Sequence, residues 1–170
     1  MNIHQRRCAM QVRSAVVTGG AVIAGLFASL VPGVAHADFI DPAPYVDANG
    51  VAWFSMAGNN CSITPNGVVG CDLPTPASIM SMTIAGMTIP VPYVPAVAID
   101  TAYFPSHPQW SSNGSHTQQG GNPAIVPGVD QYTTSVYYAG ATCTVSVRND
   151  VVCSGMSHEF RVAGLQAYGN

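Results

Sequence analysis

The chain has no lysine, and charged residues of any kind make up only 8% of its 170 residues. Three of its five arginines lie within the first 13 residues, so Arg148 and Arg161 are the only basic residues in the rest of the chain. From residue 38 onward these two stand against eight acidic residues, a formal charge of −6. Binding to nucleic-acid phosphates or to an anionic lipid surface requires several cations, so the composition argues against both partners.

The motifs of common catalytic sites are also absent. The sequence has no G-x-S-x-G elbow, no P-loop, no dinucleotide fingerprint and no H-E-x-x-H. A glycosidase-type hydrolase needs two carboxylates a few ångströms apart, and no motif pairs Asp72, Asp100, Asp130 or Glu159. The sequence therefore favours a non-catalytic protein and implies no cofactor.

The N-terminus predicts export. The early arginines precede an uncharged apolar run from Ala15 to about Val34, and Val34-Ala-His-Ala37 supplies the small residues of a cleavage site. We expect residues 1–37 to be a signal peptide removed before Asp38, with Arg6-Arg7 leaving the twin-arginine route open. An uncleaved anchor is the alternative, since the run approaches bilayer length. Cleavage would leave residues 38–170 as a single secreted or envelope domain with no stable transmembrane span.

A cysteine pattern, A-G-x-x-C-x9-C, occurs twice, at Cys61/Cys71 and again at Cys143/Cys153. The fifth cysteine, Cys8, would leave with the signal peptide, and an even count of four in an exported chain predicts disulfides. Folding residues 61–71 about Pro65-Asn66-Gly67 places the first pair opposite each other, and folding 143–153 about Val147-Arg148-Asn149 does the same for the second. Gly67 and Asn149 then take the left-handed loop position that suits them. Local disulfides are favoured over bonds between the hairpins, and over a zinc site, which usually has a C-x2-C spacing.

Each predicted hairpin has one apolar face, because side chains two apart share a face of a strand. The members are Cys61, Ile63, Val69 and Cys71 in the first, and Cys143, Val145, Val151 and Cys153 in the second. Together with short alternating runs and many glycines and prolines, these faces predict an all-β or β-dominated domain, a small sandwich or open barrel. A helix around residues 76–82 is an alternative.

Residues 73–99 contain no charge, and their prolines and Gly86 interrupt any membrane helix. Partial two-residue alternation predicts a strand pair turning at Ala85-Gly86. These strands either belong to the core or form an exposed surface, bearing Met82 and Met87, for a hydrophobic partner. The polar stretch 106–131 is typical of a long surface loop, in which Trp110, with Tyr103 and Phe104 nearby, could stack on a sugar.

A competing hypothesis is a metal-dependent or hydrolytic enzyme. Its residues would be His107, His116, His158 and Glu159, if the polar loop folds over the second hairpin. Their spacing does not require such a site, and histidines scattered in a loop are usually solvated.

Two blocks of sequence carry a resemblance. F-S-x-x-G-N-x-C-x-I-x-x-x-G-V-x-x-C-D-x-P (residues 54–74) and T-C-T-V…V-x-C…H-x-F (residues 142–160) resemble signatures of small exported actinobacterial proteins of unassigned function. The chain has Glu159 where similar proteins often have glycine. The resemblance implies export and the disulfide pattern, and no particular activity. The sequence thus predicts an exported non-catalytic module that binds an envelope protein, a lipid or a glycan.

Overall fold

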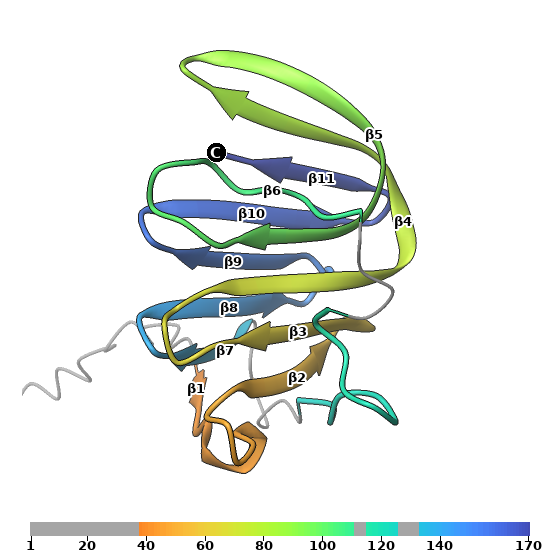
Figure 1. Cartoon of the computed structure of the whole chain (residues 1–170). Coiled ribbons are helices and arrows are strands. Elements are labelled where there is room, and N and C mark those ends of the chain that lie inside the picture. Colours follow the sequence, from red (N-terminus) through yellow and green to blue (C-terminus); the bar gives the residue numbers. More distant parts are fainter. Residues whose placement is uncertain (1–37, 111–114, 126–132) are drawn as a thin grey trace, which may run out of the picture. The chain divides into compact units, whose positions relative to one another are not determined.

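The computed structural model describes residues 38–110, 115–125 and 133–170 (Figure 1). The predicted all-β class is confirmed. The strands are β1 (Asp38–Ile40), β2 (Ala52–Met56), β3 (Asn59–Ile63), β4 (Val69–Ile84), β5 (Met87–Ile99), β6 (His107–Pro108), β7 (Thr133–Tyr138), β8 (Ala141–Ser146), β9 (Val151–Gly155), β10 (His158–Ala163) and β11 (Gln166–Gly169), with one 3₁₀ turn, η1 (Ala43–Tyr45). The helix considered around residues 76–82 is wrong, since these residues belong to β4. The predicted signal segment 1–37 and Asp130 lie outside the described residues.

All the strands join one sheet in the order β1-β7-β8-β9-β10-β11-β4-β3-β2, with β5 along β4 and β6 along β5. Strand β4 has two sets of neighbours: residues 69–72 pair antiparallel with β3, and residues 79–82 pair parallel with β11. Between them the register with β5 shifts from Asp72 to Ala77, across Pro74 and Pro76. Bulges and prolines break the ladder and bend a strand, and the sheet curls into a half-barrel (Figure 1).

Both predicted hairpins form in the predicted register. Cys61 lies opposite Cys71 and Cys143 opposite Cys153, and each pair is a disulfide with a Cα–Cα distance of 4.0 or 4.1 Å. Gly67 (φ 78°) and Asn149 (φ 60°) hold the left-handed loop positions. The local pairing is therefore confirmed, and a zinc site that uses these thiolates is wrong.

The two disulfides pack against each other in the core. Cys71 Sγ lies 3.9 Å from Cys153 Sγ, and the two residues occupy equivalent positions of the repeat, 82 residues apart. All four cysteines are buried, together with Phe54 from β2 and Phe160 from β10. The apolar hairpin faces predicted from the sequence thus bury each other at the centre of the curled sheet.

The polar segment 115–125 covers the outer edge of β2. The Ser55 N–H donates to the Pro123 carbonyl (2.8 Å) and the Ile125 N–H donates to the Ser55 carbonyl (2.9 Å). The Asn122 side-chain amide donates to the carbonyls of Phe54 and Cys61, at 3.1 and 2.9 Å. An uncovered edge strand would offer its backbone to other chains, so this part of the predicted surface loop completes the sheet.

Candidate functional site

The hairpin formed by the second half of β4 and the first half of β5 extends past its neighbours. It turns at Ala85-Gly86, as predicted, with Ile84 opposite Met87. Strand β11 accompanies β4 only as far as Met82, which pairs with Gly169. Beyond that point the hairpin is two-stranded and projects past β11 (Figure 1). Residues 85–90 are all exposed.

Opposite faces of this hairpin differ in chemistry. Met80, Met82 and Ile84 pair with Val91, Ile89 and Met87, and all six share one face. Exposure increases toward the turn: Met80 and Met82 are buried, Ile84 is half-buried, and Met87 is 64% exposed. We call Ile84, Met87 and Ile89 the apolar tip. The tip continues the apolar face of the core into solvent, with Met87 its most exposed member and Ile89 40% exposed.

Polar side chains lie on the other face of the hairpin. Ser81, Thr83 and Thr88 line a hollow of about 430 Å³, together with residues of β10 and β11 that include Glu159 and Arg161. Arg161 in turn pairs with Asp150, at 2.6 Å. Glu159 and Arg161 thus lie on the polar side of the hairpin. With one apolar and one polar face, the projecting hairpin is amphipathic.

Prolines occupy the open edge of the hairpin. In a two-residue hairpin the residues flanking the turn form a hydrogen-bonded pair, and bonded and non-bonded pairs alternate from there. Pro90, opposite Ser81, and Pro92, opposite Ile79, therefore fall at positions whose backbone points away from β4. Because proline has no N–H, this edge lacks two of the donors that a further strand would use.

Two exposed aromatic residues lie at the base of the hairpin. Tyr93 is 67% exposed and has a φ of 52°, which is uncommon for a bulky residue. Trp110 is 59% exposed, and its indole N–H donates to the Tyr93 carbonyl at 3.1 Å. Sequence reasoning missed Tyr93, although the surrounding Pro-x-x-Pro spacing marked an irregular strand. Tyr103 and Phe104 are also exposed, but Phe104 packs edge-on against His107, with the ring centroids 5.6 Å apart.

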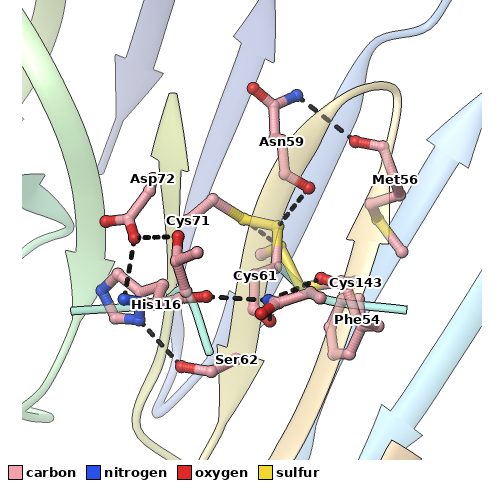
Figure 2. Close-up of a disulfide and its surroundings, with 12 residues drawn as sticks. Phe54, Met56, Asn59, Cys61, Ser62, Cys71, Asp72, His116 and Cys143 are labelled. Carbon is pink, nitrogen blue, oxygen red and sulfur yellow. Dashed lines mark hydrogen bonds between the residues drawn. A yellow bond between two sulfur atoms is a disulfide. The ribbon is translucent and has the colours of Figure 1, made fainter. Parts of the chain in front are cut away.

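His116, expected to be a solvated loop residue, is buried in a cluster of polar side chains (Figure 2). Its Nδ1 lies 2.8 Å from Ser62 Oγ and its Nε2 lies 3.0 Å from Gln109 Oε1. Because an amide oxygen only accepts, Nε2 carries the proton and Nδ1 accepts from the Ser62 hydroxyl. Gly70 makes room for the ring: a Cβ there would lie 2.3 Å from Nε2 and 2.8 Å from the Val97 carbonyl oxygen.

The serine, histidine and aspartate of this cluster do not form a catalytic triad. Asp72 Oδ2 accepts from the His116 backbone N–H at 2.9 Å and from the Thr117 hydroxyl, so it does not orient the ring as the third member of a triad does. Ser62 and His116 are only 3% and 5% exposed, which leaves no room for a substrate at the hydroxyl. Burial lowers the pKa of His116, against the attraction of the Asp72 carboxylate. The cluster fastens segment 115–125 to β3 and β4.

The four residues proposed for a metal site are dispersed. His116 is in the cluster just described, and His107 lies on β6, 3.4 Å from Asp100. His158 Nε2 donates to the Ala102 carbonyl oxygen at 3.2 Å, whereas Glu159 is exposed. Within residues 38–110, 115–125 and 133–170, no group of three or more His, Cys, Asp or Glu side chains could hold a metal ion.

His158 and Glu159 do not converge as an acid–base pair either. They border the same shallow hollow of about 470 Å³. As consecutive residues of β10, however, they point to opposite faces of the strand. The arrangement therefore provides no paired acid and base for hydrolysis.

The chain matches no protein-family model, no curated protein and no solved structure. Among the residues that the structure describes, no helix has the length and apolar character to cross a membrane.

Proposed function

We propose that residues 1–37 direct export and that residues 38–170 form a non-catalytic binding module of the cell envelope or extracellular space. The two disulfides support this location, because disulfides persist in oxidising compartments and are rare in the cytosol. The binding element is the β4–β5 hairpin, through its apolar tip.

The exposure of this tip carries the proposal. Met87 and Ile89 are large apolar side chains, 64% and 40% exposed, on a two-stranded extension, although an isolated hairpin is marginal in stability. Contiguous exposed apolar surface of this kind usually marks an interaction site. With no charge over residues 73–99, the hairpin suits an uncharged, apolar partner rather than nucleic acid.

Fractionation of the producing cells tests the function. We expect wild-type protein in the envelope fraction, and a shift of the Met87→Asp/Ile89→Asp variant to the culture filtrate, because an apolar contact does not tolerate two carboxylates. Val147→Asp is the matched control, since Val147, at the tip of the β8–β9 hairpin, is 68% exposed, compared with 64% for Met87. Intact mass before and after reduction verifies that every variant keeps both disulfides. A hairpin variant that stays with the envelope would refute binding through the apolar tip. A wild-type protein found wholly in the filtrate would refute envelope attachment and leave an extracellular module.

A further inference from the structure

Resting on this proposed function, we infer that the partner of the β4–β5 hairpin is a neutral lipid surface, into which the apolar tip inserts. Three features of the hairpin favour lipid over a protein strand or a second copy of the chain: its charge, its backbone edge and its aromatic base.

The charge distribution selects an uncharged surface. Residues 38–170 carry two arginines against eight acidic residues, so an anionic surface would repel the domain as a whole. The hairpin itself contains no charged residue, and hence no charge needs to be dehydrated on insertion. Binding should therefore depend on buried apolar area, and it should respond little to salt.

The backbone edge suits an apolar medium. In lipid each unpaired backbone N–H costs free energy, because no water is present to accept from it. Pro90 and Pro92 remove two outward donors from the open edge of β5. The same prolines oppose the addition of another strand, which is how a protein partner or a second copy would use this edge.

The aromatic base matches the boundary between lipid and water. Tyrosine and tryptophan concentrate at that boundary because each has an apolar ring and a polar atom. Tyr93 lies about seven residues from the turn, or roughly 24 Å along the strand, and the indole of Trp110 is tied to its carbonyl. A hairpin lying obliquely on the surface would bury the tip to a depth of about 5–10 Å and leave these rings near the headgroups.

Tryptophan fluorescence with vesicles tests this inference. The chain has two tryptophans, Trp53 and Trp110, so Trp53→Phe leaves Trp110 as the single reporter. With phosphatidylcholine vesicles we expect a blue shift of Trp110 emission, quenching by brominated lipid, and the same affinity at low and high salt. Met87→Asp/Ile89→Asp in this background should weaken partitioning by at least about tenfold, whereas Val147→Asp should leave it unchanged.

Several outcomes would overturn the lipid assignment. They are no blue shift, binding only after phosphatidylglycerol is added, equal binding by the tip variant, or a dimer in sedimentation that the tip variant abolishes. If vesicles fail to bind while envelope association still depends on the tip, the partner is a protein or a glycan; the lipid inference then falls and the proposed function stands. If envelope association is also independent of the tip, both fall.

Discussion

Three alanines in tight turns adopt an unfavourable left-handed backbone conformation. Ala57, Ala85 and Ala139 have φ values of 49°, 50° and 46°, each followed by a glycine with positive φ. Two-residue turns of this kind require φ > 0 at both central positions, where a Cβ is unfavourable and Asn or Gly is preferred. Each alanine–glycine pair joins two adjacent strands, at β2–β3, β4–β5 and β7–β8. The strand pairing on both sides offsets the local cost.

At the same scale, buried His116 makes stability depend on pH. Burial lowers the pKa of His116 in the folded protein, whereas a histidine in the unfolded chain has a pKa of about 6.5. Below about pH 6.5 the unfolded chain therefore binds a proton that the folded chain rejects. We expect the free energy of unfolding to fall as the pH drops from there until the folded state also takes up the proton, by at most about 1.4 kcal/mol per pH unit.

Urea denaturation across this pH range, with disulfides intact, measures the effect. His116→Gln should be less stable at neutral pH and should show a shallower acid slope. His107→Gln is the control, because His107 is half-buried and lies against Asp100. If the free energy of unfolding of His116→Gln falls with acid as steeply as that of the wild type, or if His107→Gln flattens this dependence, a group other than His116 causes it.

Among the structural elements, the two stapled hairpins act as one unit because their disulfides touch. Closing a loop of about ten residues should stabilise each hairpin by roughly 2–3 kcal/mol. With Cys71 Sγ 3.9 Å from Cys153 Sγ, removing one disulfide also takes away a packing partner of the other. Residues in contact commonly show coupling energies of about 0.5–3 kcal/mol.

We therefore expect the two disulfide deletions to be non-additive. The comparison uses Cys61→Ala/Cys71→Ala, Cys143→Ala/Cys153→Ala and the variant with all four substitutions, each unfolded in urea. The quadruple variant should lose a different free energy from the sum of the two pairs, by more than about 0.5 kcal/mol. Strict additivity would mean that the hairpins are stabilised independently despite their contact.

For the whole molecule, the curled sheet depends on distant pairing that closes the core. Strand β11 pairs parallel with the second half of β4, joining segments more than 80 residues apart in sequence. Strand β11 ends opposite Met82, whereas β4 continues to Ile84, so the end of the β4–β5 hairpin lies beyond the pairing with β11.

Export of this domain is a prediction about the whole molecule. In culture filtrate or detergent-extracted envelope, we expect a species that begins at Asp38. On reduction its mass should increase by two hydrogens for each of the two disulfides. A species that retains residues 1–37 would instead indicate an anchored domain, and one without a mass change on reduction would indicate that the disulfides do not form in the cell.

Local rules explain what the sequence by itself determined. The all-β class, both disulfide pairs, the hairpin registers and the turn at Ala85-Gly86 all follow from two-residue periodicity and from turn chemistry, which act within about a dozen residues. Gly67 and Asn149 marked the left-handed position of the two loops, because glycine and asparagine adopt that backbone with less strain than other residues.

Only the tertiary structure decided which of the candidate residues are accessible. Met82 and Met87 look equivalent in sequence, yet pairing with Gly169 of β11 covers the first and leaves the second in solvent. His116 belongs to a polar stretch but is buried against Ser62 and Gln109. Such outcomes depend on contacts between segments tens of residues apart, whose pairing no local pattern specifies. The sheet therefore decided both the burial of the histidine and the exposure of the tip.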